Sequence, residues 1–135
     1  MPRNEYVAVL HAPIVRRRTI VETESGALTA FCVQLEFNHA PDIEESDDWG
    51  YVARFDHKPS STDGHDIREE GLHIDIRHPQ EGDRTYTNFP PVPLERAPTY
   101  AEEHFDEMYL EICDRYLNWC KDVEESWVSI LALPR

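Results

Sequence analysis

The sequence predicts an α+β protein, with an antiparallel sheet of four to six strands and one long C-terminal helix packed on one face. Apolar and polar residues alternate in several segments of residues 5–89, which is the pattern of half-buried strands. After Pro98, apolar residues recur at three- and four-residue spacing, which is the pattern of one helix face. Prolines between the two regions favour an extended, helix-free connector.

The first strands are predicted from composition and turn signals. Residues 5–10 are rich in strand formers, and residues 14–23 resume an extended pattern after Pro13, which indicates a bend or an edge position. Ser25-Gly26 is a turn signal, and residues 27–37 alternate almost strictly. We therefore expect a hairpin that turns at Ser25-Gly26.

Later elements are expected in the following order. Residues 41–48 are predicted to form an acidic loop, a strand opens at Trp49, and a short strand occupies residues 84–89. The helix is predicted from residue 99 to about residue 125, because Thr99 and Glu102 match a capping box and the apolar stripe runs on from there. The apolar tail at residues 128–133 fits either an added strand or a contact with another chain.

Arg16, Arg17 and Arg18 are the only basic run in the sequence. On a strand, Arg16 and Arg18 share one face and Arg17 points to the other. Two roles stay open for them. One is phosphate binding, and the other is pairing with glutamates of the hairpin, namely Glu22, Glu24 and Glu36.

The composition is strongly acidic, with 27 Asp and Glu against 13 Lys and Arg and a formal charge of −14. This bias is typical of halophilic proteins, whose acidic surfaces keep them soluble in molar salt, and we expect a fold that weakens at low salt. An acidic surface shaped for a basic partner is the alternative. The charge does not exclude RNA as a substrate, because molar salt screens most of the repulsion.

Length and hydropathy predict one soluble, cytoplasmic domain over residues 1–135. No apolar run approaches the ~20 residues that cross a bilayer, so we expect no membrane contact. The first residues carry no signal-peptide core. Cys32, Cys113 and Cys120 are expected to be free thiols.

The candidate functional site is the histidine-rich stretch at residues 54–78. Turn-forming residues in its middle and alternation at residues 72–76 predict two strands joined by a polar loop. This arrangement puts His57 at the end of one strand, His65 on the returning loop and His73 on the outward face of the next strand. We expect the three imidazoles to converge on one patch.

The residue types of this patch suit proton transfer and the binding of an anionic group, because histidine changes charge near neutral pH. Solvated histidines on an exposed sheet face are the alternative. His11, His39 and His104 lie outside the predicted patch. The candidate catalytic residues are Arg54, Asp56, His57, His65 and His73.

The main interpretation requires no metal and no other cofactor. A metal hydrolase is a further interpretation, although the spacing of the available ligands matches no known site. Its candidate ligands are His57, Asp63, His65, Asp66 and His73.

Three segments of the stretch carry a family resemblance, namely Tyr51-Val52-Ala53-Arg54-Phe55-Asp56-His57, Gly64-His65-Asp66 and Gly71-Leu72-His73-Ile74-Asp75. They resemble uncharacterised haloarchaeal proteins and, more distantly, the TumE-type toxins of toxin–antitoxin pairs. The resemblance implies a curved antiparallel sheet, a His-bearing loop and a C-terminal helix. It marks Arg54, Asp56, His65 and His73 as counterparts of that family's polar core, with His57 a weaker match. The loop at residues 58–63 and the helix are longer here than in those toxins.

Two functions from different classes follow. In an RNA-cleaving toxin, one histidine removes the 2′-hydroxyl proton, a second protonates the leaving oxygen, and Arg54 steadies the phosphorane charge. In a binding or regulatory module, the sheet edge or the apolar tail docks a protein partner. The expected partners are an antitoxin protein, an RNA substrate and a second copy of the chain in a homodimer.

Overall fold

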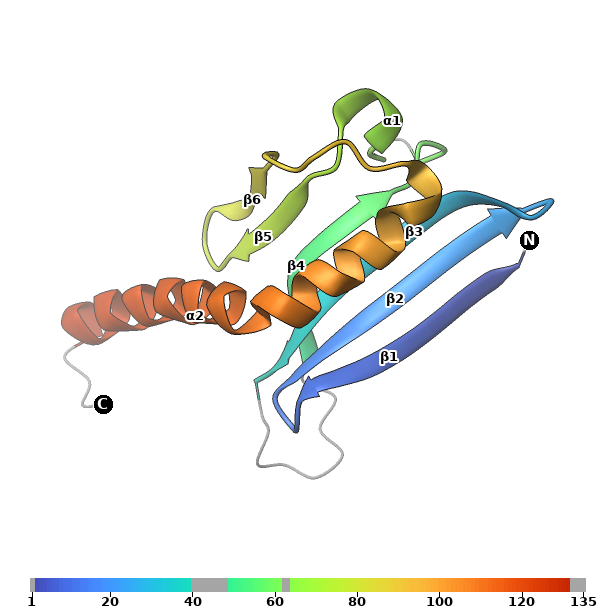
Figure 1. Cartoon of the computed structure of the whole chain (residues 1–135). Coiled ribbons are helices and arrows are strands. Elements are labelled where there is room, and N and C mark those ends of the chain that lie inside the picture. The colour runs from blue at the N-terminus through green and yellow to red at the C-terminus, as the bar shows by residue number, and fades with distance from the viewer. Residues whose placement is uncertain (1, 40–48, 62–63, 132–135) are drawn as a thin grey trace.

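The structure is a computed structural model that describes residues 2–39, 49–61 and 64–131. Six strands form one open antiparallel sheet in which every strand pairs with its neighbours in the chain (Figure 1). The strands are β1 (Arg3–His11), β2 (Val15–Glu24), β3 (Ala27–Asn38), β4 (Trp49–His57), β5 (Ile74–His78) and β6 (Gly82–Tyr86). The helices are α1 (Ile67–Glu70), the 3-10 turn η1 (Leu94–Arg96) and α2 (Ala97–Leu131). The predicted α+β fold is confirmed.

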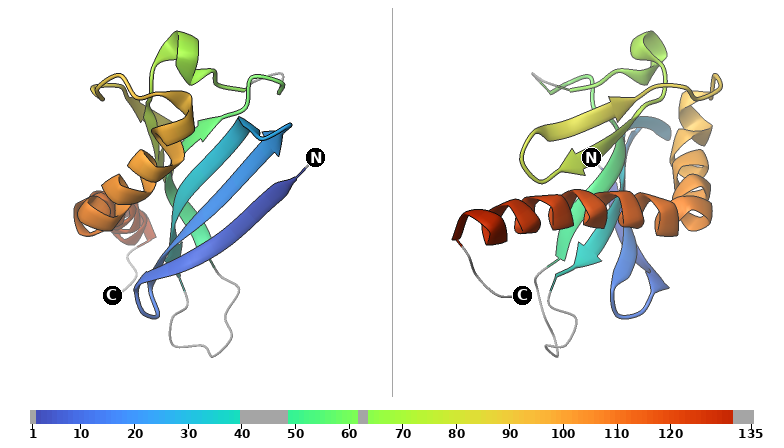
Figure 2. Two further views of the ribbon diagram at one scale, coloured as in Figure 1. Left: turned by 45° about the vertical axis from the view of Figure 1, so that its right-hand side comes forward. Right: turned by 90° about the vertical axis from the view of Figure 1, so that its left-hand side faces the viewer.

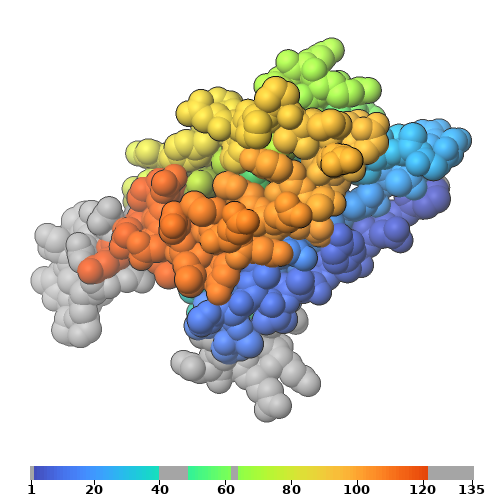
Figure 3. All heavy atoms as spheres, viewed as in Figure 1, coloured from blue at the N-terminus to red at the C-terminus, as the bar shows by residue number. Residues whose placement is uncertain are grey.

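Helix α2 covers one face of the sheet, and the space-filling view shows it lying across the strands (Figure 3). Phe105 on α2 is fully buried, and its ring centroid lies 5.2 Å from that of Phe55 on β4. Figure 2 shows the helix and the sheet as two layers, with a bend part-way along α2. Beyond the bend the helix follows the hairpin of β5 and β6, where Trp119 lies 4.9 Å from His78. The core therefore lies between α2 and one face of the sheet, as the apolar stripe predicts.

The hairpin of β2 and β3 turns at the predicted residues. Ser25 has φ 51° and Gly26 has φ 80°, both in the left-handed region. Successive positive φ values are typical of the two-residue turns whose twist matches that of the flanking strands. Beyond the turn the register shifts once, between Glu22 and Thr23, and from there Thr19 faces Val33 and Arg16 faces Glu36.

The arginine run divides between the two faces as predicted. Arg16 Nε lies 2.6 Å from Glu36 Oε1, and Arg18 Nε lies 3.1 Å from Glu36 Oε2, on the face away from α2. Burial opposes ionisation of Glu36, but hydrogen bonds from Arg16, Gln34 and Arg18 outweigh it and lower the pKa of this carboxyl. Arg17 points to the helix and pairs with Asp106. The pairing interpretation holds for Arg16 and Arg18.

Three local expectations need correction. Helix α2 begins at Ala97, so Thr99 lies inside the helix and is not its N-cap. The helix can include Pro98 because the missing N–H of a proline is not needed in the first turn. The helix continues to Leu131, so residues 128–131 form no added strand. The histidine-rich stretch contains the short helix α1, which the sequence pattern did not predict. The predicted acidic loop at residues 41–48 lies outside the described residues.

Within the described part of the chain, no helix combines the length and the apolar character needed to cross a membrane.

Candidate functional site

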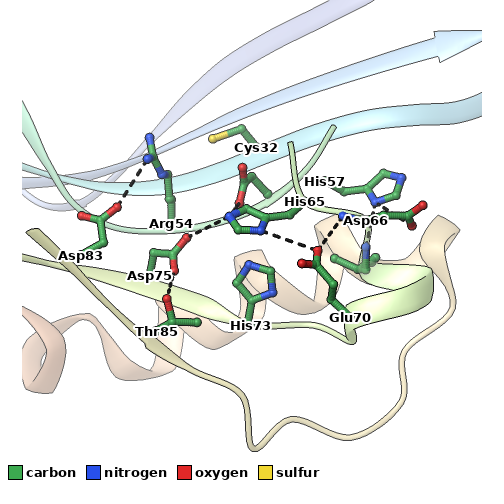
Figure 4. A network of polar contacts seen from close by, with 12 residues as sticks. Cys32, Arg54, His57, His65, Asp66, Glu70, His73, Asp75, Asp83 and Thr85 are labelled. Carbon is green, nitrogen blue, oxygen red and sulfur yellow. Dashed lines mark hydrogen bonds and ion pairs between the residues drawn. The ribbon is translucent and has the colours of Figure 1, made fainter. Parts of the chain in front are cut away.

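Polar side chains of the histidine-rich stretch gather on the sheet face opposite α2 (Figure 4). Phe55 packs against the helix, so its strand neighbours Arg54 and Asp56 point to the other face. Asp75 on β5 is the cross-strand partner of Arg54 and therefore shares that face. Two adjacent strands thus supply an arginine and two carboxylates at one place.

Loop geometry adds two histidines to these strand residues. The backbone N–H of Lys58 donates to the carbonyl of His65 at 2.9 Å, which returns the chain to the end of β4. Asp66 then caps α1 with its side chain. Gly71, with φ 78°, ends that helix and places His73 directly before β5.

We call Asp56, His65, His73 and Asp75 the His–Asp cluster. Each offers one nitrogen or carboxylate oxygen, and these four atoms all lie within 4.8 Å of one another. The rings of His65 and His73 are 4.3 Å apart. His65 Nε2 lies 3.7 Å from Asp75 Oδ2 and 4.0 Å from Asp56 Oδ1.

The tautomer of His73 follows from its one contact with the backbone. His73 is only 5% exposed, and its Nδ1 lies 3.3 Å from the carbonyl oxygen of Gly71. A carbonyl oxygen can only accept, so Nδ1 carries the hydrogen and Nε2 of the neutral ring keeps a lone pair. Nε2 is buried and has no hydrogen-bond partner among the described residues. His73 thus lies on the strand face away from α2, as predicted, but it is buried there, so the alternative of a solvated histidine does not hold for it.

Two further side chains orient the cluster from outside. Glu70 Oε2 lies 3.6 Å from His65 Nδ1, which leaves Nε2 of that ring facing the two aspartates. The hydroxyl of Thr85 donates to Asp75 Oδ1 at 2.5 Å, so Oδ2 is the oxygen turned towards His65. Such outer partners fix ring and carboxylate orientation around metal ions in proteins.

The carboxylates of the cluster lie close to each other in a partly desolvated site. Burial raises the pKa of Asp56, and the Asp75 carboxylate adds to that rise, although His65 and Arg54 oppose it. One buried oxygen of Asp56, Oδ1, has no hydrogen bond within the described residues. A cation would stabilise both ionised carboxylates.

His57 is not part of this arrangement, although the sequence predicts its convergence with His65 and His73. Its ring lies on the α2 side of the sheet, is 1% exposed, and stacks on Phe31 at 6.2 Å between centroids. Its Nδ1 accepts the backbone N–H of Ile67 at 3.1 Å. His57 therefore holds the start of α1 in place and does not face the cluster.

This role of His57 predicts a pH-dependent stability. Burial lowers the pKa of His57 from its ordinary 6.5, so the fold favours the neutral ring. Its contribution is complete above pH 6.5 and is lost as the pH falls towards the lower folded pKa. Asn keeps an acceptor near the Nδ1 position but does not titrate. We therefore expect the melting temperature of His57→Asn to fall less than that of the parent when the pH is lowered from about 7.5 to about 5.5.

The control for this experiment is His11→Ala, which removes an exposed ring. Its melting temperature should follow pH as in the parent. Equal pH dependence in His57→Asn and the parent would contradict the role of His57.

Arg54 lies beside the His–Asp cluster. Its Nη2 is 3.5 Å from Asp83 Oδ2, and its guanidinium lies 4.6 Å above the ring of Tyr51. The hydroxyl of Tyr51 donates to the same carboxylate at 2.8 Å. The Nε of Arg54 is buried without a hydrogen bond to any described residue.

The structure changes the ligand set that the sequence suggests for a metal. Asp66 caps α1 and binds Arg68, and Asp63 lies outside the described residues. Asp56 and Asp75 take the carboxylate positions instead. The spacing His73-x-Asp75 on a strand could have indicated Asp75, since residues two apart share a face. Nothing in the sequence indicates Glu70 or Thr85, because their roles depend on loop and strand pairing.

The donors of the His–Asp cluster fit a divalent transition metal. Two imidazoles and two carboxylates are ligands that suit zinc, manganese or iron. Ligand atoms at ~2.05 Å from a tetrahedral ion lie about 3.3 Å apart. Starting from a cluster within 4.8 Å, no donor needs to move by more than about 1 Å to close around an ion.

Fold and site together define an open antiparallel α+β sheet protein with the His–Asp cluster on the face that its long helix leaves uncovered. The chain belongs to the family described as Domain of unknown function (DUF7718), whose model matches residues 1–122 and thus includes the whole cluster. No curated protein and no solved structure matches the chain significantly. Neither a haloarchaeal origin nor the TumE-type resemblance is confirmed by these comparisons, and both stay predictions.

Proposed function

We propose that the chain is a divalent-metal-dependent hydrolase of phosphate esters, with the His–Asp cluster as its metal centre. The observation that carries this proposal is His73 Nε2, which is buried, unpaired within the described chain and grouped with three other ligand-type side chains. A buried polar atom without a partner costs about 1–3 kcal/mol. An ion bound to this nitrogen removes that cost.

The charges around His65 favour a metal cation over a phosphate placed directly between the imidazoles of His65 and His73. Carboxylate oxygens of Asp56, Asp75 and Glu70 all lie within 4.0 Å of its ring nitrogens. These carboxylates repel a phosphate, whereas a dication offsets their charge and attracts one. The metal therefore makes the site suitable for an anionic ester.

A bound dication would supply the nucleophile, because it lowers the pKa of a water ligand, to about 7 in the case of zinc. In the hydrolysis, the water oxygen bonds to phosphorus, the bond from phosphorus to the leaving oxygen breaks, and the leaving oxygen takes a proton from solvent. Glu70 and Thr85 would hold His65 and Asp75 in orientation. His65 is 35% exposed, which leaves water access to the cluster.

The second candidate is the metal-independent ribonuclease that the sequence predicts. One observation favours it, since the 4.3 Å separation of the His65 and His73 rings suits an acid–base pair beside Arg54. RNA as substrate and toxin activity towards a cell stay predictions in either mechanism. Cleavage that persists in excess chelator would favour this second candidate.

The test is metal binding by the chelator-treated protein. Calorimetric titration with zinc, manganese and magnesium is expected to show one site per chain for at least one ion, together with a rise in melting temperature. Activity towards bis(p-nitrophenyl) phosphate should disappear in chelator and return with that ion. Asp75→Asn should abolish both binding and activity.

The matched control is Asp106→Asn, which removes a helix carboxylate that pairs with Arg17 on the other face of the sheet. This variant should bind the ion like the parent. Binding that survives Asp75→Asn unchanged, or the absence of a stoichiometric site for every ion tried, would overturn the metal centre.

A further inference from the structure

A cavity of about 170 Å³ adjoins the His–Asp cluster, and Asp56 belongs to both. Three basic side chains line it, namely Arg3, Arg54 and Lys58. Glu22 and Asp56 also line it, so basic side chains outnumber acidic ones by three to two at this cavity, whereas the whole chain has 13 Lys and Arg against 27 Asp and Glu. Such a reversal indicates an anionic ligand.

Arg54 and Lys58 are available to a ligand, whereas Arg3 pairs with Glu5 at 3.1 Å. Arg54 Nε is buried and makes no hydrogen bond within the described chain, and Nη2 has only the 3.5 Å contact with Asp83. Lys58 is 3.8 Å from Glu22 in an exposed pair. Exposed ion pairs contribute at most about 1 kcal/mol, so an anion can compete with Glu22 for this lysine.

Apart from the three cations and the carboxylates of Glu22 and Asp56, the cavity wall is uncharged. Ile20 and Phe31 line it together with Cys32. Burial, reinforced by Asp56, raises the pKa of the Cys32 thiol to about 11, so this side chain is neutral. A cavity of about 150 Å³ can hold a benzene molecule, so this one takes a phosphate group or a small ring but not a whole nucleotide.

We infer that this cavity binds the phosphate group of the substrate, with Arg54 on one side of the phosphate and the metal centre on the other. The role of this phosphate in a reaction rests on the proposed function, whereas the binding of an anion in the cavity does not. Arg54 and Asp56 are two residues apart on one face of β4, roughly 6.6 Å between Cα atoms, so one phosphate can contact both the guanidinium and an ion held by Asp56. Because the cavity is small, the substrate class is a phosphate ester whose organic part lies outside it along the sheet.

The experiment measures binding of inorganic phosphate by calorimetry, with and without the metal ion that the protein binds. Arg54→Gln is expected to weaken phosphate binding about 10- to 100-fold, the range for losing hydrogen bonds to a charged group. Lys58→Gln should weaken it less, because Lys58 is more exposed. In the ester assay, Arg54→Gln should raise KM more than it lowers kcat.

Arg77→Gln is the matched control. Arg77 also lies over the Tyr51 ring, at 5.4 Å, but does not line the cavity, so its removal should leave phosphate binding unchanged. Melting temperatures of all three variants check that they are folded.

The outcomes separate this inference from the proposed function. Phosphate binding that depends on Arg54 in a protein without a metal site would support the cavity and overturn the hydrolase. A stoichiometric metal site without phosphate binding, or phosphate binding equal in Arg54→Gln and the parent, would overturn the cavity and leave the metal centre standing.

Discussion

Replacing His73 with leucine is expected to stabilise the metal-free protein by about 1–3 kcal/mol while weakening its affinity for a divalent ion more than about 100-fold. The stability gain is expected because leucine fills a similar space without the buried, unpaired Nε2. The Nδ1 contact that is lost goes to Gly71, an exposed residue whose carbonyl can accept from water instead. The affinity loss is expected because even an outer partner of a metal ligand contributes about 10- to 100-fold, and a direct ligand contributes more.

Urea unfolding of the chelator-treated protein measures the first effect, and calorimetric titration measures the second. His65→Leu should weaken ion binding without the same stability gain, because the His65 ring is partly exposed. A natural protein that keeps a destabilising buried group is using it for function. If His73→Leu instead destabilises the metal-free protein by several kcal/mol, roughly as a core truncation does, His73 has a structural role and the proposed function loses its main support.

Phe105→Ala is expected to destabilise the protein by about 3–5 kcal/mol, the range for truncating a large buried aromatic side chain. Phe105 is 0% exposed and packs against Phe55 and His104, at 5.2 Å and 6.2 Å between ring centroids. The cavity left by the ring would lie between α2 and β4, where two faces of packed side chains cannot readily close it. Urea unfolding at one fixed salt concentration measures the change.

Leu110→Ala on the same helix is the control, because Leu110 is 63% exposed and should change the free energy of unfolding by less than about 0.5 kcal/mol. Phe105→Ala should leave ion affinity of the folded fraction unchanged, since α2 and the His–Asp cluster lie on opposite faces of the sheet. A loss of less than about 1 kcal/mol would contradict the position of the core between α2 and β4.

His104 illustrates how packing alters the expected role of a residue. The sequence places it outside the predicted patch, so its replacement by alanine is expected to change activity little. In the structure its ring lies 5.5 Å from Phe55 and 5.3 Å from Phe89, and burial lowers its pKa. His104 is therefore a core contact, and replacing it is expected to lower stability even though it lies outside the candidate site.

Local sequence pattern determined the strands and the long helix of this protein, though not the short helix α1, and it determined the faces of the strands. Two-residue alternation predicts which side chains share a face, so the division of Arg16 and Arg18 from Arg17 could be predicted. Ser25-Gly26 determines the hairpin because both residues adopt positive φ. The spacing of apolar residues after Pro98 determines the helix and the face that it buries.

Only the tertiary structure decided which of the predicted site residues meet. Alternation along β4 puts the side chains of Asp56 and His57 on opposite faces of the sheet, whereas the predicted patch includes both. The backbone bond from Lys58 to His65 and the cap at Asp66 turn His65 towards Asp75, while Ile67 takes up the lone pair of His57 on the other side. Cross-strand pairing of β4 with β5 then adds Asp75 to Asp56. Apart from the cap at Asp66, these contacts join residues 7 to 21 positions apart in sequence, and their free energy depends on the whole packed sheet, which no local pattern contains.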